Sequence, residues 1–243
     1  MDTLGIYSAG ITVSKRIFLK TEKLEIALAE EIINCLERDL KEHKEAKLLL
    51  SGGSTPKNLY ARLSESDIDW AKVSIGLVDE RFVSPDDMQS NERMIKNTLL
   101  QGKASKAKFI GLVYDTTDLD KNTELALKQN KPFMEGISCV LLGMGSDGHT
   151  ASLFPNDECS TNSLVEKKNP KPLIITNSPA KPKVRISYTK EPLLNTKKLF
   201  LYFSGDEKMK VFSQAKRYND PKVTPISSFI HQKEILLEVF WTF

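Results

Sequence analysis

The sequence predicts an α/β fold with a mainly parallel β-sheet covered by helices on both faces. Short apolar runs alternate with amphipathic segments, which is typical of parallel strands joined by helices. Leucine and isoleucine recur every four residues from Leu24 to Leu40, which predicts a long amphipathic helix. Hydrophobic residues make up 40% and charged residues 28% of the 243 residues, so the chain can bury a sizeable core.

The order of strand and helix continues along the chain, with proline and serine marking helix ends. Pro56 is expected in the first turn of a helix, Ser90 is expected to cap another, and Pro132 stops a third. The predicted strands are 47–50, 73–78, 109–114, 137–142, 173–175, 199–203 and 235–241, and the predicted helices are 24–40, one from Pro56, 90–100, 119–131 and 206–217.

The length suits one domain, and we expect residues 1–243 to form a single catalytic α/β domain. No internal repeat or low-complexity tract divides the chain. The stretch 167–183, rich in proline and lysine, is interpreted as a loop-rich excursion within that domain and as a candidate lid.

The charge balance excludes strong electrostatic binding of nucleic acids or membranes. Lysine and arginine total 35 and aspartate and glutamate 32, so the net charge is only +3. No apolar run approaches the roughly 18 residues of a membrane span, and no signal peptide is recognised. The three cysteines are scattered, as in a reducing compartment. We therefore expect a cytoplasmic protein that is a monomer or a weak homo-oligomer, with a small molecule as its partner.

Three unusual clusters follow predicted strands, at residues 51–56, 79–83 and 143–155. In open parallel sheets, ligands bind beyond the carboxyl ends of the strands. The shared position of the three clusters therefore predicts one site built from all of them.

The first cluster is a glycine loop that opens a helix and predicts an anion site. Glycines let the backbone approach a phosphate, and the N–H groups of a helix N-terminus point toward it. The loop is not a Walker A motif, because no Gly-Lys-Ser/Thr closes it, and a plain strand-to-helix turn is the alternative. The candidate phosphate-binding residues are Ser51, Gly52, Gly53, Ser54 and Thr55.

The third cluster contains a histidine suited to general base catalysis. His149 can accept a proton near neutral pH, and Asp147 could orient or polarise it. A structural or surface histidine is the alternative. Glycines 143, 145 and 148 also match a dinucleotide fingerprint, but Pro155 follows too closely for the long helix that this fingerprint opens. The other histidines offer no ligand spacing with His149, so a three-histidine metal site has little support.

The second cluster places charges directly after an apolar strand. Asp79 and Arg81 would lie at the rim of the same crevice, where Arg81 could hold a sugar oxygen or a developing oxyanion. A solvated turn is the alternative.

Taken together, the clusters resemble the 6-phosphogluconolactonase family. The string Gly-x-Gly-x-Asp-Gly-His-Thr-Ala-Ser-Leu-Phe-Pro at 143–155 is highly specific, and the resemblance covers nearly the whole chain. It implies a three-layer αβα fold similar to that of glucosamine-6-phosphate deaminases, and cofactor-free, metal-free hydrolysis of 6-phospho-D-glucono-1,5-lactone. It also implies that Arg185 and Lys208, with Gly145 and the first cluster, bind the sugar phosphate.

The implied mechanism is direct attack of water on the lactone, with His149 as the base. Asp147 or Asp79 would fix the imidazole, and Arg81 or loop N–H groups would stabilise the oxyanion. The first alternative is a deaminase of the same superfamily, which carries glutamate where this chain has Phe154. The second is a non-catalytic sugar-phosphate sensor.

Overall fold

The computed structural model describes residues 12–165 and 171–243, which contain two β-sheets. The strands of the larger sheet are β1 (Val13–Phe18), β2 (Ala46–Leu50), β3 (Val73–Leu77), β5 (Lys108–Ile110), β6 (Ile137–Leu142), β9 (Thr196–Ser204) and β10 (Leu237–Thr242). They are all parallel, in the order β1-β10-β9-β6-β2-β3-β5. The smaller sheet is antiparallel and has the order β4-β8-β7, with β4 (Asp79–Arg81), β8 (Val184–Tyr188) and β7 (Leu173–Asn177).

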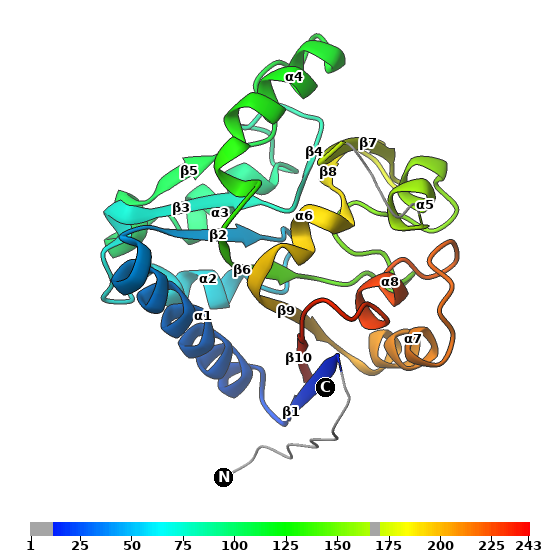
Figure 1. Cartoon of the computed structure of the whole chain (residues 1–243), viewed down its shortest axis with the longest axis horizontal. Helices are drawn as coiled ribbons and strands as arrows, with labels where there is room; N and C mark the ends of the chain where they lie inside the picture. Colours follow the sequence, from blue (N-terminus) through cyan, green and yellow to red (C-terminus); the bar gives the residue numbers. More distant parts are fainter. Residues whose placement is uncertain (1–11, 166–170) are drawn as a thin grey trace.

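Helices flank the parallel sheet on both faces, as the sequence predicts. The α-helices are α1 (Thr21–His43), α2 (Lys57–Ser64), α3 (Asn91–Thr98), α4 (Leu119–Gln129), α5 (Glu158–Val165), α6 (Lys190–Leu194), α7 (Asp206–Arg217) and α8 (Ser227–Ile230). Short 3₁₀ turns, η1 (Trp70–Lys72), η2 (Gly102–Lys106) and η3 (Lys131–Phe133), complete the connections. Figure 1 shows α1 on one side of the sheet and α6 and α8 on the other.

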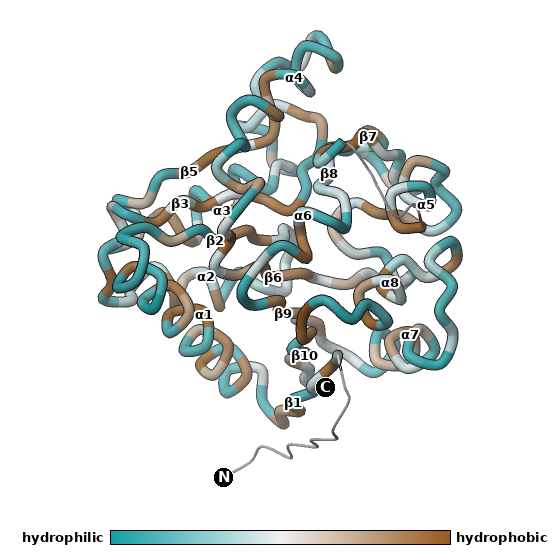
Figure 2. The backbone as a smooth tube through the Cα atoms, in the orientation of Figure 1, coloured by the Kyte–Doolittle hydropathy of each residue, from teal (hydrophilic) through white to brown (hydrophobic). Residues whose placement is uncertain are grey.

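The amphipathic pattern decides which side of each helix is buried. Leu24, Leu28, Ile32 and Leu36 on α1 are fully buried, whereas Glu30 and Arg38 are exposed; two acidic residues of α1, Glu25 and Asp39, are also buried. Figure 2 shows this alternation of brown and teal along α1. Ser90 caps α3 as predicted, since its Oγ accepts a hydrogen bond from the Arg93 N–H at 3.1 Å.

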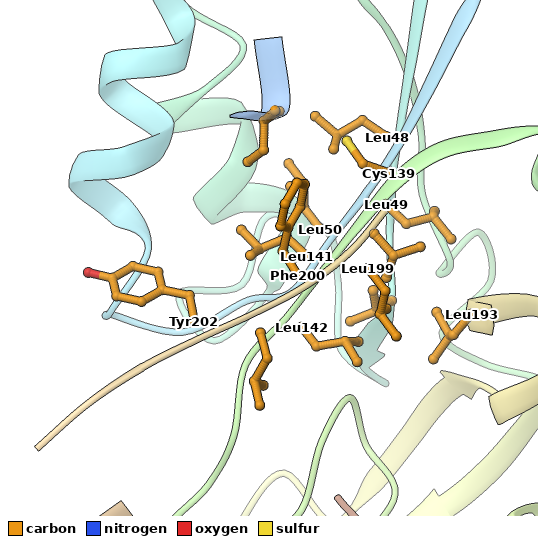
Figure 3. Close-up of a cluster of buried hydrophobic side chains, with 14 of the residues drawn as sticks. Leu48, Leu49, Leu50, Cys139, Leu141, Leu142, Leu193, Leu199, Phe200 and Tyr202 are labelled. Atoms are coloured by element: carbon orange, nitrogen blue, oxygen red, sulfur yellow. The ribbon is translucent and has the colours of Figure 1, made fainter. Parts of the chain in front are cut away.

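The central strand β6 lies in the densest part of the core. All six of its residues are buried, as expected for a strand covered on both faces. Figure 3 shows Leu141 and Leu142 of β6 among leucines of β2 and the apolar side chains of β9. One cluster of buried residues also includes Ile186 and Tyr188 from the smaller sheet, so the two sheets share a core.

The smaller sheet differs from what the sequence predicts. The sequence places residues 79–81 directly after an apolar strand, as a charged crevice rim or, alternatively, a solvated turn, and predicts no further strand there; in the structure they form β4 by pairing with β8. Within the stretch 167–183, the predicted strand at 173–175 is present as β7 (Leu173–Asn177), which pairs with β8. The part of the candidate lid at 167–170 lies outside the described residues. Edge strand β1 was not predicted, because its residues show no clear apolar alternation.

The order of the strands opens a crevice at the carboxyl ends of β2 and β6. From β2 the chain continues to β3 and β5 on one side, whereas from β6 it continues to β9 and β10 on the other. The loops after these two adjacent strands therefore diverge, which is the usual position of a ligand site in an open α/β sheet. Within the described ranges, no helix is long and apolar enough to span a membrane.

Candidate active site

A cavity of about 240 Å³ opens where the loops after β2 and β6 diverge. All three clusters that the sequence singled out contribute to its wall. The lining residues are Ser51, Gly52, Gly53, Ser54, Thr55, Pro56, Asp79, Arg81, Asn91, Leu141, Leu142, Gly143, Met144, Gly145, His149, Ala151, Tyr202 and Lys208.

The glycine loop is held between β6 and α2. The Ser51 N–H donates to the Leu141 carbonyl at 3.0 Å, and the Tyr60 hydroxyl donates to the Ser51 carbonyl at 2.5 Å. The hydroxyls of Ser54 and Thr55 make no hydrogen bond with any described residue. The loop therefore has a fixed backbone and free donors, which suits an anion.

Glu80 fixes the rim of the cavity next to α3. Its buried carboxylate accepts hydrogen bonds from the N–H groups of Arg81, Asn91 and Glu92 at 2.6 to 2.8 Å, and from the Ser90 hydroxyl at 3.0 Å. Burial raises the pKa of Glu80 to about 7, although these hydrogen bonds oppose the rise. The carboxylate thus joins β4 to the start of α3.

The two charged candidates on β4 have separate partners. The Asp79 carboxylate accepts a hydrogen bond from the Ser152 hydroxyl at 2.5 Å. Arg81 donates from Nη1 to the Gln89 carbonyl at 2.5 Å and lines the cavity. Ser152 belongs to the loop after β6, so Asp79 connects the second cluster to the third.

His149 and Asp147 form a contact at the cavity wall. His149 Nδ1 lies 2.5 Å from Asp147 Oδ1, and the backbone N–H of His149 donates to the same oxygen at 3.1 Å. Burial alone would raise the pKa of Asp147, but the hydrogen bond and charge of His149 lower it overall. Because Asp147 occupies Nδ1, the opposite ring nitrogen of His149 is left for a ligand or water.

Gly145 makes room for this pair. A Cβ at this position would lie 2.2 Å from His149 Nδ1 and 2.6 Å from Asp147 Oδ1, closer than any real contact. The loop closes on itself through the Gly145 N–H, which donates to the His149 carbonyl at 2.9 Å. Position 145 therefore requires glycine, because a residue with a Cβ would clash with the His149 ring and the Asp147 carboxylate.

Phe154, five residues after His149 in the loop that follows β6, packs against the imidazole ring. The two ring centroids are 4.9 Å apart and the rings are tilted by 46°. Phe154 is 5% exposed, and its ring offers no acid or base to the site. An apolar wall therefore stands where the sequence comparison with deaminases expects glutamate.

Lys208 supplies a cation to the cavity from the first turn of α7. It makes no ion pair or hydrogen bond with any described residue. Burial lowers the pKa of Lys208, and the nearby charge of Asp147 opposes this. A half-buried amine without a partner is suited to an anionic ligand.

Arg185 does not line the cavity in the described structure. It lies opposite Arg81 in the register of β8 and β4, and its Nε is buried without a hydrogen-bond partner. Burial and the charge of Arg81 lower the pKa of Arg185. The other predicted site residues, eleven in the three clusters and on α7, all lie at or directly against the cavity.

Two lining residues with polar side chains, Asn91 and Tyr202, were not predicted as site residues. Asn91 follows the predicted cap of α3, and Ser90-Asn91 is one of the segments on which the family resemblance rests, but the sequence indicated no role for Asn91. Tyr202 lies within a predicted strand and resembles an ordinary core aromatic, but its hydroxyl donates to Glu25 at 3.4 Å. Figure 3 shows this hydroxyl directed away from the leucines of the core.

One group of side chains elsewhere has the spacing of metal ligands. Among the described residues, Asp39, Glu42 and His43 come close together near the end of α1. Asp39 is already paired with Lys197 at 2.7 Å, and none of the three lines the cavity. The group therefore has no part in the site.

Comparison with known proteins identifies close relatives of this arrangement. Residues 20–241 match the family model described as "Glucosamine-6-phosphate isomerases/6-phosphogluconolactonase". The chain is 31% identical to a 6-phosphogluconolactonase of Rhizobium meliloti (95% of this chain, 99% of the relative) and 36% identical to one of Helicobacter pylori strain J99 (92% and 96%). It is also similar to the crystal structure of a 6-phosphogluconolactonase from Shewanella baltica, with a TM-score of 0.89 and 35% identity over 94% of this chain and 97% of the other.

Proposed function

The chain belongs to the glucosamine-6-phosphate isomerase/6-phosphogluconolactonase family, and on that premise we propose that it hydrolyses 6-phospho-D-glucono-1,5-lactone to 6-phospho-D-gluconate with His149 as general base. It is a lactone hydrolase, as its near full-length relatives are. The observation that carries the mechanism is the 2.5 Å contact between His149 Nδ1 and Asp147 Oδ1 at the cavity wall.

The contact with Asp147 supports a defined role for each imidazole nitrogen. A carboxylate only accepts, so Nδ1 carries the hydrogen and Nε2 is the acceptor in the neutral ring. Nε2 would remove a proton from a water molecule above the lactone carbonyl carbon. Asp147 would hold the ring in place and stabilise the imidazolium that forms, whereas Asp79 is engaged by Ser152.

Water attack makes one bond and breaks another. The water oxygen bonds to C1, which becomes tetrahedral and carries an oxyanion. Arg81 or backbone N–H groups of the loop after β6 would stabilise that charge. The bond from C1 to the ring oxygen then breaks, and His149 returns the proton to this oxygen as a hydroxyl. The acid product ionises and releases a proton to water.

The phosphate of the substrate would be held at the other side of the cavity. The loop from Ser51 to Thr55 supplies hydroxyls and backbone donors, and Lys208 supplies a cation that makes no ion pair or hydrogen bond with a described residue. Arg185, the cross-strand partner of Arg81 in the β4–β8 pair, would contribute through its charge. Binding a remote phosphate positions the lactone, and positioning can supply a large share of the barrier reduction.

Phe154 favours hydrolysis over deamination. The deaminase branch of the family carries a glutamate at this position, and here the side chain is an aromatic ring against His149. A ring cannot transfer the protons that an isomerising deaminase needs. We also propose that the whole chain works as one catalytic domain, since both sheets share one core.

A coupled assay tests the function directly. Lactone is generated in place from glucose 6-phosphate by a dehydrogenase, and its decay is compared with spontaneous hydrolysis. Replacing His149 with alanine should lower kcat by about 10²- to 10⁴-fold with little change in KM, because a positioned base contributes in that range. His43→Ala is a matched control, since His43 is exposed and remote from the cavity. Near-normal turnover in His149→Ala would overturn the mechanism, and ammonia release from glucosamine 6-phosphate would indicate the deaminase instead.

A further inference from the structure

We infer that Asn91 accepts a hydrogen bond from one ring hydroxyl of the substrate and thereby selects a fully hydroxylated sugar; this inference rests on the proposed function. Asn91 is the first residue of α3, is 2% exposed and lines the cavity beside Gly52. It has no assigned role in the reaction, and its contacts determine what kind of group it can recognise.

Two N–H groups of Asn91, one on the side chain and one on the backbone, donate hydrogen bonds to other residues of the protein. The side-chain Nδ2 donates to the Asp79 carbonyl at 3.0 Å, and the backbone N–H donates to Glu80 Oε1 at 2.8 Å. A carbonyl oxygen only accepts, so the amide has one possible orientation. The side chain is therefore locked with its nitrogen toward β4 and its oxygen on the opposite side.

The side-chain oxygen of Asn91 has no donor among the described residues. Oδ1 takes part in no hydrogen bond, and it is not one of the fully enclosed polar atoms. A Cβ on Gly52 would lie only 1.9 Å from Oδ1, so only glycine at position 52 lets the Asn91 amide pack this closely against the loop. An acceptor held in this way at a cavity wall lacks the donor that a bound ligand can supply.

An acceptor in this position discriminates between the groups of a sugar phosphate. Phosphate and carbonyl oxygens only accept hydrogen bonds and would be repelled by Oδ1, which is also an acceptor. A hydroxyl, in contrast, can donate a hydrogen bond to Oδ1. The phosphate is therefore assigned to the part of the site with the Ser54 and Thr55 hydroxyls and Lys208, and a ring hydroxyl to the part where Asn91 Oδ1 lies against Gly52. The lactone carries hydroxyls on C2, C3 and C4, and a substrate lacking the right one would leave Oδ1 unpaired in a buried place.

The test crosses an Asn91→Ala variant with substrates that lack single hydroxyls. kcat/KM is measured for wild type and variant on the parent lactone and on its 2-, 3- and 4-deoxy forms. For one of the three positions, removal of the hydroxyl should lower kcat/KM of the wild type about three- to tenfold and leave kcat/KM of the variant almost unchanged. This is the loss expected for one neutral hydrogen bond. A purely structural role would instead lower kcat/KM for all four lactones by the same factor, and that result would overturn the inference.

Controls separate this inference from the proposed function. Asn97→Ala makes the same change on an exposed residue of α3 and should behave as wild type on all four lactones. If Asn91→Ala does not fold, Asn91→Ser, which also lacks the amide acceptor, replaces it in the same comparison. Binding of 6-phosphogluconate and its deoxy analogues, measured by calorimetry, repeats the comparison without turnover. Failure of wild type to hydrolyse the parent lactone would refute the function alone, whereas equal deoxy penalties in wild type and variant, in both assays, would refute the role of Asn91.

Discussion

Replacing Gly145 with alanine is expected to lower kcat by about 100-fold or more while leaving the fold and KM nearly unchanged. The added methyl would sit 2.2 Å from the Nδ1 and Cε1 atoms of His149. Carbon atoms in contact are normally about 3.5 Å apart, so the ring must move by more than ~1 Å. The contact between His149 and Asp147, now 2.5 Å, would then exceed hydrogen-bonding distance.

The size of the effect follows from what that displacement removes. A misplacement of about 1 Å can cost roughly 100-fold in rate, and complete loss of a positioned base costs about 10²- to 10⁴-fold. Gly145 does not have a positive φ, so alanine is compatible with its backbone. The loop can therefore stay folded while the catalytic pair is pushed apart.

Gly143→Ala is the matched comparison in the same loop. Its methyl would meet Ser51 Oγ at 3.5 Å, an ordinary contact, and its backbone is equally permissive. We expect a much smaller loss of kcat than in Gly145→Ala, with both variants melting close to wild type. Steady-state kinetics on freshly generated lactone and thermal unfolding provide the measurements. Turnover in Gly145→Ala within a few-fold of wild type, or an equal loss in Gly143→Ala, would refute the reasoning.

Three further predictions concern charged groups. Asp147→Asn should lower kcat by about 100-fold or more, because an amide can turn its donor toward His149 and favour the wrong tautomer; unchanged kcat in the coupled assay would contradict this. Lys208→Ala should raise KM and the inhibition constant of phosphate about tenfold or more, and Arg185→Ala should raise both in the same direction; if neither constant moves, the phosphate binds elsewhere. Burial raises the pKa of Glu80 in the folded state from 4.5 to about 7, so the folded protein binds this proton more tightly than the unfolded chain does. The stability that the proton provides is complete below about pH 4.5 and is lost as the pH rises through 7. Urea unfolding should therefore show wild type losing about 3 kcal/mol relative to Glu80→Gln over that window, and a constant difference would disprove it.

The main elements of the fold were predictable because their signals are local. The four-residue apolar repeat of α1 and the apolar run of β6 depend only on helix and strand periodicity. The structure confirms both and the cap at Ser90. β4 and β8 were not predicted, because β4 is a polar triplet that becomes a strand only through its partner.

The candidate site was predictable to the extent that it lies at strand ends. Asp147 and His149 are two residues apart in a tight loop, so their proximity follows from the chain itself. The sequence left open whether Asp147 or Asp79 contacts the imidazole. In the structure Asp79 is bound by Ser152, which is 73 residues away along the chain.

The sequence by itself determined that parallel strands alternate with helices, that glycine loops and charges gather at the carboxyl ends of the strands, and that a histidine and an aspartate lie together in one of those loops. Only the tertiary structure decided that Arg185 lies beside Arg81 across the β4–β8 pair, and that Asn91 presents beside Gly52 an acceptor that no described residue engages. The physical reason is the range of the interactions. Periodicity and turn chemistry act over a few residues, whereas side chains from distant segments meet only when packing fixes the register of both sheets.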